Sequence, residues 1–513
     1  MKLTWSGALL GRTRRRLAGG SARRGVMAVV AAGVAVVCAG LLTGAGLAPA
    51  AAGARAAAAG VQWGRAEKVP GLATLNRGGN AHATSVSCWA VNYCAAGGYY
   101  TDRRGHSQAF VVTERKGRWG DAVQVPGTAA LNTGGTAGVS SVSCTPRGYC
   151  AAGGNYTDRR GHNQAFVVTW PKHHRWRAAV EVPGSAALNT AGSAQVTSVS
   201  CVSAGNCAAG GYYDARACRR YAPCDTQAFV VSQAGGVWGT AEELPGTAAL
   251  NTAGSARVTS VSCWSAGNCA ASGYYNNGPG GPGAFVASEE KGVWDSAQEV
   301  PGLAALNTAG AASATAVSCA RDGYCAAGGV FTQTDVDGND NPEPFVVSAN
   351  NGVWGTAVAW PLDFYGLGLP ETLDAVSCAS ADYCGAAGYT SFTNYPGTSS
   401  AFWVSQTNGV WAASDQSLPG YYAQNLTSLS CPSTGNCGAG GYCLYCRKGS
   451  QAVVAGERNG VWANAKLMPG ALALDKSRNA QVTSVSCPSA GNCTAAGFYT
   501  DAKKRSQAFV SGP

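Results

Sequence analysis

Pairs of cysteines recur along this sequence, and in each pair five residues separate the two thiols. The stretch from Ser484 to Cys493, "SVSCPSAGNC", is one of eight similar copies. Two thiols at this spacing could bind a metal, act as a redox pair or be joined by a disulfide, and each chemistry suits a different compartment. The eight pairs are Cys88/Cys94, Cys144/Cys150, Cys201/Cys207, Cys263/Cys269, Cys319/Cys325, Cys378/Cys384, Cys431/Cys437 and Cys487/Cys493.

Disulfides explain these cysteines best. A structural zinc site needs four ligands, whereas each copy offers two cysteines and no histidine at a fixed spacing. Of the 21 cysteines, Cys38 lies near the N-terminus, and the four outside the eight pairs lie as Cys218/Cys224 and Cys443/Cys446. Cys443 and Cys446 have the spacing of a redox pair, but they fall in a loop between strands, so a structural bridge is favoured there too. The even number in an exported chain predicts a disulfide framework of all twenty remaining cysteines.

The cysteine pairs belong to a repeat of 51 to 62 residues, in which a tryptophan ends a segment similar to Gly-Val-Trp. Each repeat holds four segments rich in β-branched and aromatic residues, such as "VTSVSC", "CAASGYY", "AFVAS" and "GVWDSAQEV" between Val258 and Val300. Four antiparallel strands per repeat form one blade of a β-propeller. The repeated tryptophans are Trp63, Trp119, Trp176, Trp238, Trp294, Trp354, Trp411 and Trp462.

We therefore predict an all-β, eight-bladed propeller of four-stranded antiparallel blades. The chain enters the repeat at the Trp63 segment, which is a fourth strand, and ends after "QAFVSGP", which is a third strand. The N-terminal strand can then complete the last blade and close the ring. A β-solenoid is the main alternative, although its periods are usually shorter.

In such a blade the two cysteines face each other across the hairpin between the innermost and second strands. Opposed residues of an antiparallel pair have Cβ atoms about 4.5 to 5.5 Å apart. A small adjustment reaches the roughly 3.8 Å of a disulfide. One bridge per blade would add about 2 to 3 kcal/mol to the free energy of unfolding.

The first sixty residues have the composition of an export signal. Basic residues precede an apolar run from Val26 to Ala48, and small residues follow at Ala48 to Ala51. This order predicts a signal peptide over residues 1–52, a short linker over 53–60 and a single propeller over 61–513. An uncleaved membrane anchor is the alternative, because the apolar run is about as long as a membrane-spanning helix. We expect a secreted, extracellular or cell-wall-associated monomer with no membrane contact after the signal is removed.

The charge of the mature chain gives no reason to expect nucleic acid as a partner. Eight of the 37 basic residues lie in the first sixty positions, which leaves 29 against 27 acidic residues from Val61 onward. Nucleic-acid binding depends on neutralising phosphates with a basic surface.

Basic loops between the second and third strands are the first candidate ligand site. They carry Arg103, Arg104, Arg159, Arg160, Arg219 and Arg220, with further cations at Arg216, Arg447, Lys448, Lys503, Lys504 and Arg505. In a closed ring the five blades concerned are neighbours, so these residues could form an arc that holds an anionic polymer. The alternative is a set of solvated loops, some with arginine paired to the adjacent aspartate.

Two further candidates lie where other blades depart from the repeat. Blade five carries Asp335, Asp337, Asn339, Asp340 and Asn341, oxygen ligands that could hold Ca²⁺ although their spacing is not that of an EF-hand.

In blades six and seven the usual "PGTAALNTAG" is replaced, which could bring aromatic rings to one face for stacking on sugars or only as substitute packing. These rings are Trp360, Phe364, Tyr365, Tyr421 and Tyr422.

No catalytic motif accompanies these candidates. The five histidines, His82, His106, His162, His173 and His174, show no partner pattern, and neither a Gly-x-Ser-x-Gly elbow nor an HExxH motif occurs. The Gly-Val-Trp segments also lack the Asp and Thr of the sialidase Ser-x-Asp-x-Gly-x-Thr-Trp box, and the tryptophan motif of quinoprotein dehydrogenases is missing. Catalytic residues stay unidentified, and no cofactor beyond Ca²⁺ is expected.

Over nearly all its mature length the chain resembles a large set of secreted actinobacterial repeat proteins built on Ser-x-Ser-Cys-x-Ser-x-x-x-Cys-x-Ala-x-Gly. Ser486, Cys487 and Ser489 match this pattern, followed by Cys493, Ala495 and Gly497. The resemblance implies a propeller outside the membrane and supplies no catalytic residues.

The sequence thus predicts a non-catalytic binding or scaffold propeller that recognises an extracellular or cell-wall polymer, either carbohydrate or anionic, through its variable loops. The alternative is an extracellular hydrolase or lyase that acts on polysaccharide.

Overall fold

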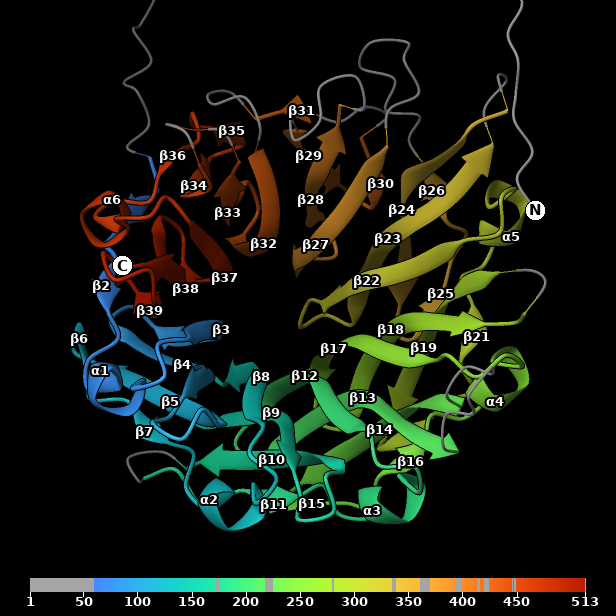
Figure 1. Cartoon of the computed structure of the whole chain (residues 1–513). Helices are drawn as coiled ribbons and strands as arrows, with labels where there is room; N and C mark the ends of the chain where they lie inside the picture. Colours follow the sequence, from blue (N-terminus) through green and yellow to red (C-terminus); the bar gives the residue numbers. More distant parts are fainter. Residues whose placement is uncertain are drawn as a thin grey trace, which may run out of the picture. The chain divides into compact units, whose positions relative to one another are not determined.

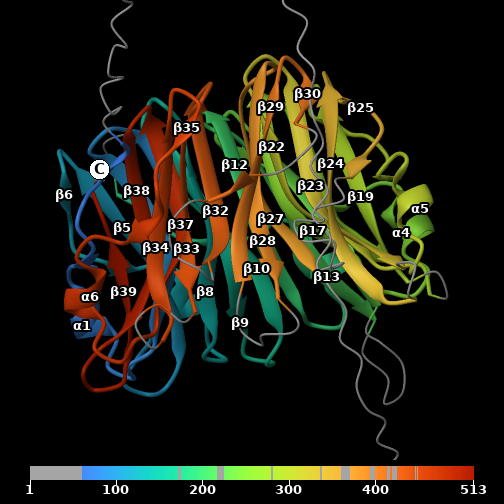
Figure 2. The same cartoon turned by 90° about the horizontal axis from the view of Figure 1, so that it is seen from above.

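The computed structural model describes residues 60–512, apart from 172–174, 217–224, 279–280, 335–337, 360–369, 393–398, 413–415, 419–423, 445 and 447–448. The predicted leader, residues 1–52, and the linker up to residue 59 lie outside the described residues. Eight β-sheets follow one another along the chain and are arranged as a ring (Figures 1 and 2). The predicted eight-bladed propeller is therefore confirmed. Among the described residues, no helix has the length and hydropathy needed to cross a membrane.

Each blade runs outward from an innermost strand through a second strand to a third. The innermost strands are β3 (Ala81–Ala90), β8 (Ala137–Cys144), β12 (Ala194–Ser203), β17 (Arg257–Ser265), β22 (Ala312–Cys319), β27 (Glu371–Ser380), β32 (Gln424–Ser433) and β37 (Ala480–Ser489). The second strands are β4 (Tyr93–Thr101), β9 (Cys150–Thr157), β13 (Asn206–Arg216), β18 (Asn268–Asn276), β23 (Tyr324–Thr334), β28 (Tyr383–Ser391), β33 (Asn436–Cys443) and β38 (Asn492–Thr500). The third strands are β5 (Ser107–Arg115), β10 (Asn163–Trp170), β14 (Asp225–Ala234), β19 (Pro282–Glu290), β24 (Asp340–Asn350), β29 (Ser399–Thr407), β34 (Gln451–Arg458) and β39 (Ser506–Val510).

In the described residues, the outer edge is made of two short segments in seven blades and of one in blade two, instead of the one continuous fourth strand that was predicted. The first segments are β1 (Gln62–Trp63), β6 (Arg118–Trp119), β15 (Val237–Trp238), β20 (Val293–Trp294), β25 (Val353–Trp354), β30 (Val410–Trp411) and β35 (Val461–Trp462). The second segments are β2 (Glu67–Lys68), β7 (Val123–Gln124), β11 (Val180–Glu181), β16 (Glu242–Glu243), β21 (Gln298–Glu299), β26 (Val358–Ala359), β31 (Gln416–Ser417) and β36 (Lys466–Leu467).

The break in the outer strand has a physical reason. The chain leaves the ladder after the tryptophan, and the backbone N–H of Ala122 donates to the carbonyl of Pro70, which follows the outer edge of the preceding blade. The same bond joins Ala297 to Pro245, at 2.7 Å. The outer edge therefore gives up ladder pairing to make a backbone bond between neighbouring blades.

Single helical turns lie at the outside of the ring, in the connections that lead from one blade to the next (Figure 1). They correspond to the "GTAAL" part of the repeat, which the sequence predicted only as connection. These turns are α1 (Leu72–Leu75), α2 (Thr128–Leu131), α3 (Ser185–Leu188), α4 (Thr247–Leu250), α5 (Leu303–Leu306) and α6 (Ala471–Leu474).

The hydrophobic core lies between successive blades. In the first seam, which is the boundary between blades one and two, Val111 packs with Val139, Val142 and Phe166 of the second blade. A Cβ added to Gly97 would lie 2.8 Å from Cγ1 of Val139, so only glycine lets the neighbouring blade approach this closely. The repeated "AAGG" of the second strand thus sets the spacing between blades.

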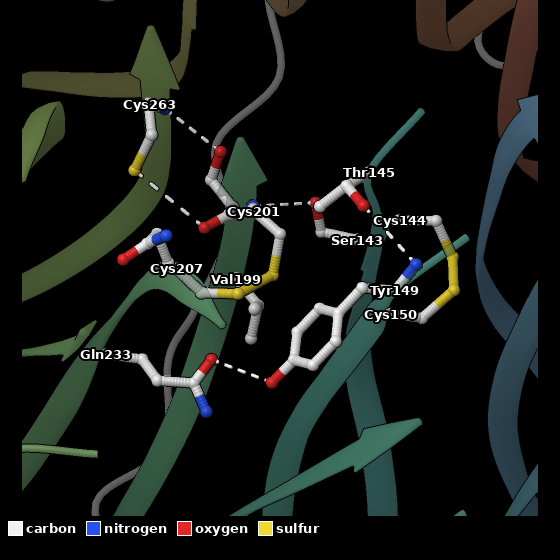
Figure 3. Close-up of a disulfide and its surroundings, with 12 residues drawn as sticks. Ser143, Cys144, Thr145, Tyr149, Cys150, Val199, Cys201, Cys207, Gln233 and Cys263 are labelled. Atoms are coloured by element: carbon white, nitrogen blue, oxygen red, sulfur yellow. Dashed lines mark hydrogen bonds between the residues drawn. A yellow bond between two sulfur atoms is a disulfide. The ribbon is translucent and has the colours of Figure 1, made fainter. Parts of the chain in front are cut away.

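Serine hydroxyls join the innermost strands into a closed ring. The serine directly before the first cysteine of each blade accepts a hydrogen bond from the backbone N–H of the first cysteine of the next blade, at 2.9 to 3.0 Å. Figure 3 shows two of these contacts, Ser143 with Cys201 and the bond to Cys263. An innermost strand has an open edge, and each hydroxyl satisfies an N–H that lacks a strand partner. The donors from blade one to blade eight are Cys88, Cys144, Cys201, Cys263, Cys319, Cys378, Cys431 and Cys487.

The predicted hairpin disulfides are confirmed. Each of the eight pairs is bridged across the first hairpin of its blade, with Cα atoms 3.9 to 4.1 Å apart. Cys443 and Cys446 are also bridged, with Cα atoms 5.7 Å apart. Cys218 and Cys224 lie outside the described residues. So many disulfides are typical of an oxidising or extracellular environment.

The second cysteine of each hairpin is buried, as suits a structural bridge. Cys94, Cys150, Cys325 and Cys384 have no exposed surface and belong to the hydrophobic clusters between blades. These cysteines are therefore part of the core, because the second strand lies between two others and both of its faces are covered by neighbouring blades.

The last blade is completed by the N-terminal segment, as predicted. β2 pairs with β39 in antiparallel fashion, while β1 pairs in parallel with β38, where Trp63 lies opposite Cys493. In other blades the end of the third strand holds this place, for example Glu289 opposite Cys269. Because β39 is only 5 residues long, the N-terminal segment replaces the end of the third strand as well as the fourth.

We expect Ser143→Ala to lower the free energy of unfolding by about 1 to 2 kcal/mol, because the N–H of Cys201 loses its hydroxyl acceptor at the strand edge. Urea unfolding at neutral pH measures this change. Ser296→Ala is the matched control, since Ser296 is exposed on the outer edge of blade four. Equal stability of the two variants would contradict the role of the serine ring.

Glu114 predicts a pH dependence of stability at the seam where the ring closes. Its side chain is fully buried, and neither carboxylate oxygen has a partner among the described residues. Burial, and then the charge of Glu67, raise the pKa of Glu114 to about 7. The folded state therefore keeps its proton at a pH where the unfolded state has lost it, so its contribution is full below about pH 4.5 and is lost as the pH rises to 7.

Glu114→Gln should reduce the loss of stability between pH 4.5 and pH 8 by about 2 to 4 kcal/mol, as measured by urea unfolding at both pH values. Glu290→Gln serves as the control because Glu290 is exposed and lies beside Lys291. An unchanged pH dependence in Glu114→Gln would show that Glu114 ionises normally in the folded protein.

Candidate functional site

The two ends of the ring carry different structures. One end, which we call the loop face, holds the loops between second and third strands together with the connections between blades. Hydrogen bonds join the two kinds of loop there: the N–H of Ser107 donates to the carbonyl of Gly135, and the N–H of Asn163 donates to the carbonyl of Gly192. The other end, the disulfide face, holds the eight bridged hairpins.

The basic loop of blade one is shaped by its aspartate. Asp102 Oδ1 accepts backbone N–H bonds from Arg104 and His106, at 2.8 and 3.0 Å, and Oδ2 accepts a bond from Gln108 Nε2 at 3.0 Å. Burial alone would raise the pKa of Asp102, but the bonds from Gln108, His106 and Arg104 outweigh it and lower this pKa. The carboxylate is therefore ionised at neutral pH and is used by the loop itself.

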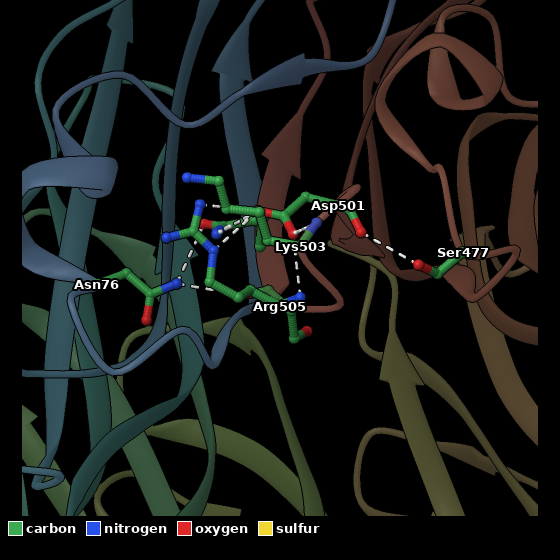
Figure 4. Close-up of polar contacts among 7 residues, drawn as sticks. Asn76, Ser477, Asp501, Lys503 and Arg505 are labelled. Carbon is green, nitrogen blue, oxygen red and sulfur yellow. Dashed lines mark hydrogen bonds and ion pairs between the residues drawn. The ribbon is translucent and has the colours of Figure 1, made fainter.

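Blades two and eight repeat this loop. Asp158 accepts the N–H bonds of Arg160 and His162 in the same way. In blade eight, Asp501 accepts the N–H bonds of Lys503 and Arg505, and it also pairs with the Arg505 guanidinium at 2.9 Å (Figure 4).

Because each aspartate serves the loop backbone, six cations of these three neighbouring blades project into solvent. Within the part of the chain that the structure describes, none of the six forms an ion pair. The alternative, in which some arginines pair with a nearby aspartate, is found for Arg505 with Asp501 and for Arg216 with Asp225 at 3.8 Å. The exposed cations are Arg103, Arg104, Arg159, Arg160, Lys503 and Lys504.

Each basic loop is fixed to the next blade by an asparagine of the repeated "LNT" segment. Asn132 Nδ2 donates to the carbonyl of Ser107 and to Gln108 Oε1, both at 3.0 Å, and its Oδ1 accepts the N–H of Thr157 in blade two. A groove of about 490 Å³ lies beside this network and is lined by Arg103, Arg104, His106, Gln124 and Thr133, among others. The cations therefore stand on a fixed frame next to a hollow in the surface.

A second set of residues, which we call the inner belt, surrounds the axis of the ring near the loop face. Each blade contributes one register pair, formed by a residue near the start of the innermost strand and its neighbour on the second strand. The pairs are His82/Tyr99, Gly138/Asn155, Gln195/Tyr212, Arg257/Tyr274, Ser313/Val330, Thr372/Tyr389, Asn425/Tyr442 and Gln481/Phe498.

Aromatic rings of the belt pack against polar side chains of the next blade. His82 is stacked between Phe498 and Tyr99, with ring centroids 3.9 and 5.1 Å away, and burial lowers its pKa to about 4. The Arg257 guanidinium lies over the ring of Tyr212, 4.1 Å from the centroid, in a cation–π contact. Five tyrosines of the belt are half-buried and present part of their rings to solvent: Tyr99, Tyr212, Tyr274, Tyr389 and Tyr442.

The wall below the belt consists mostly of hydroxyl side chains. Thr84 lies at a bulge of β3 and donates to the carbonyl of Val139 in the next blade at 2.6 Å. Asp374 holds the same bulge position in β27, and burial raises its pKa to about 6. In the described part of this wall, Asp374 is thus a single acidic side chain among serines and threonines.

The inner belt was not predicted. The first tyrosine of the "GYY" segment recurs in several blades, so the repeat alone does not mark it as a site residue. The available signal was the residue before each "VTSVSC"-like segment, which changes from His82 to Gln195 to Arg257 while the segment itself repeats.

Several predicted site residues lie outside the described residues: the aromatic set Trp360, Phe364, Tyr365, Tyr421 and Tyr422, together with Arg219, Arg220, Asp335 and Asp337. Of the predicted calcium ligands, Asp340 accepts a bond from Thr334 Oγ1 at 2.8 Å, and Asn339 and Asn341 flank it. Over the described ranges, no group of three or more His, Cys, Asp or Glu side chains could hold a metal ion. Calcium binding stays a prediction.

We expect Asp102→Ala to loosen the blade-one loop, because the amides of Arg104 and His106 lose a charged acceptor. Hydrogen exchange of these two amides should accelerate at least about fivefold, given a typical value of 1.5 to 3 kcal/mol for such bonds. Asp121→Ala, an exposed change in the same blade, should leave their exchange unchanged. Equal exchange in both variants would disprove this account of the loop.

No protein-family model and no curated protein matches this sequence. Among solved structures, an ulvan lyase of a polysaccharide lyase family, bound to its sugar, is 8% identical with a TM-score of 0.40, over 79% of this chain and 96% of its own. A Hadza microbial sialidase is 10% identical with a TM-score of 0.36, over 69% and 73% of the two chains. An acylaminoacyl peptidase of Pyrococcus horikoshii is 8% identical with a TM-score of 0.42, over 82% and 57%.

Proposed function

We propose that this protein is an exported propeller that binds an anionic polysaccharide of the cell wall or its surroundings on the loop face of blades eight, one and two. The observation that carries the proposal is the set of six exposed cations on three adjacent blades, whose neighbouring aspartates are occupied by loop backbone. Free guanidinium groups bind carboxylate and sulfate groups through paired hydrogen bonds.

The geometry favours a polymer over a small anion. The cations stand on three separate blades, so one ligand must extend across two seams to reach them all. Arg103 and Arg104 border a groove of about 490 Å³, which can hold a sugar unit of such a chain.

The half-buried tyrosines of the inner belt add a second kind of contact. Tyr99 and Tyr212 present amphipathic rings near the axis, and the faces of such rings suit the apolar faces of sugars. A chain that leaves the basic loops toward the axis would meet these rings.

Export is part of the same proposal. The disulfides suit an oxidising environment, and the N-terminal segment has the composition of a signal peptide. Ser486, Cys487 and Cys493 match the motif of the secreted actinobacterial repeat proteins, so we place the chain with that group.

Binding to polygalacturonate, an anionic polysaccharide, tests the proposal, with neutral dextran as the comparison. Arg103→Ser/Arg104→Ser should weaken binding about fivefold, because two exposed charges contribute roughly 1 kcal/mol together. Lys116→Ser/Arg118→Ser is the matched control, since it removes the same charge from the disulfide-face end of the same blade.

Binding should also weaken as NaCl rises from about 50 to 500 mM, because salt screens exposed charges. A pull-down of the mature chain with purified cell walls extends the measurement to the natural polymer. Salt-insensitive binding, or an equal loss in both double variants, would overturn the role of the basic loops.

A further inference from the structure

The residue before the second cysteine of each hairpin differs between blades, being tyrosine in four and asparagine in four. In blade two it is Tyr149, whose ring lies in the seam beside the disulfide between Cys201 and Cys207 (Figure 3). Its hydroxyl donates to Gln233 Oε1 of blade three at 2.9 Å. The phenol therefore fills the seam and satisfies a buried polar group of the next blade.

Two other seams repeat this contact. Tyr383 of blade six donates to Glu457 Oε2 of blade seven at 2.6 Å, and its ring packs with Cys431 and Cys437. The hydroxyl of Tyr324 in blade five is hydrogen-bonded to Gln406 Nε2 of blade six. A phenol beside a disulfide, bonded to an acid or amide, is thus a recurring arrangement of this fold.

The seam between blades three and four has the acid but lacks the phenol. Asn206 holds the tyrosine position, and its amide turns back to Ser203 Oγ at 2.9 Å within its own hairpin. Glu289 holds the acid position and is only 1% exposed. Ser232 donates to Glu289 Oε1 at 2.5 Å, while Oε2 is buried without a partner among the described residues.

A cavity takes the place of the missing ring. It measures about 770 Å³, within the size range of ligand pockets, and opens toward the disulfide face. Asn206, Glu289 and Trp294 line it, together with Cys263 and Cys269, the disulfide that corresponds to the one beside Tyr149.

We infer that this cavity binds a phenolic ring, with the ligand hydroxyl donating to Glu289 Oε2 and the ring lying against the Cys263–Cys269 disulfide. The ligand would reproduce the contact that Tyr149 and Tyr383 make within the chain. The cavity is larger than one ring, so the phenol belongs to a larger molecule, either a small phenolic compound or a polypeptide with an exposed tyrosine. The inference is independent of polysaccharide binding, because the cavity lies at the other end of the ring.

The electrostatics of the cavity favour a hydroxyl donor. Burial raises the pKa of Glu289, the bond from Ser232 partly offsets this, and nearby Glu242 raises it again. In the occupied seam, the bond from Tyr383 lowers the pKa of Glu457 against the larger effect of burial. A phenol hydroxyl at Oε2 would relieve the same cost of burying a carboxylate.

Binding of N-acetyltyrosinamide to the mature, disulfide-bonded protein tests this inference by titration calorimetry or ligand-observed NMR. N-acetylphenylalaninamide is the matched probe, because it differs only by the hydroxyl. We expect at least about tenfold tighter binding of the tyrosine probe, since an analogue that lacks the hydroxyl leaves the buried acceptor unpaired. Equal affinity for the two probes, or no binding of either, would overturn the inference.

Two variants locate the site. Asn206→Tyr should fill the cavity from within the chain, abolish binding of the tyrosine probe and raise Tm. Asn436→Tyr makes the same change in the seam between blades seven and eight, where Trp63 stands in place of the acid, and should leave binding unchanged within about twofold. Equal loss of binding in both variants would place the phenol elsewhere.

A final comparison separates the two sources of the phenol. p-Cresol represents a small compound, and a tyrosine-containing hexapeptide represents a polypeptide partner. Tighter binding of the peptide supports a protein ligand, whereas tighter binding of p-cresol supports a free phenolic compound. Failure of both probes in the protein that still binds polygalacturonate would reject this inference alone.

Discussion

The open edge of each innermost strand is the constraint on which this ring depends. Eight such edges surround the axis, and each would leave backbone N–H groups without strand partners. Serine hydroxyls supply the missing acceptors, one in every blade before the first cysteine and a second in five blades, and one of these bonds joins Ser486 to Cys88 across the two ends of the chain. Serine therefore performs between blades the task that backbone carbonyls perform within them, while the adjacent disulfide fixes the hairpin that carries it.

This division of tasks leaves certain positions free to vary. Residues that bond or pack across a seam are repeated, whereas His82, Gln195 and Arg257 occupy equivalent places with different chemistry. Asn206 and Tyr149 differ in the same way on the disulfide face. Both candidate sites thus lie at positions where the repeat fixes the backbone but the residue type differs from blade to blade.

Much of the fold could be predicted because it follows from the number and spacing of the repeated residues. The spacing of the cysteines and tryptophans determines the number of blades. The Trp63 segment resembles the fourth strand of the other repeats, which is why it was expected to complete the last blade. The inner belt could not be predicted, because β4 is buried on both faces along most of its length, so a period of two does not tell which of Tyr99 and Tyr100 is buried. Whether Arg104 forms an ion pair could not be predicted either, because the carboxylate of Asp102 could bond to a guanidinium or to the backbone N–H groups of the loop.

The pairing of Gln62 and Trp63 with the last blade has a consequence for how the protein forms. The N–H of Gly64 donates to the carbonyl of Gly512, so the first residues of the propeller cannot form their native contacts until residues near position 512 are available. Seven blades can form before the last strand is available, but the eighth cannot be completed until the two distant segments meet. Contacts between such distant residues form slowly, so the unclosed ring is the species in which exposed seams are most vulnerable to proteases and aggregation.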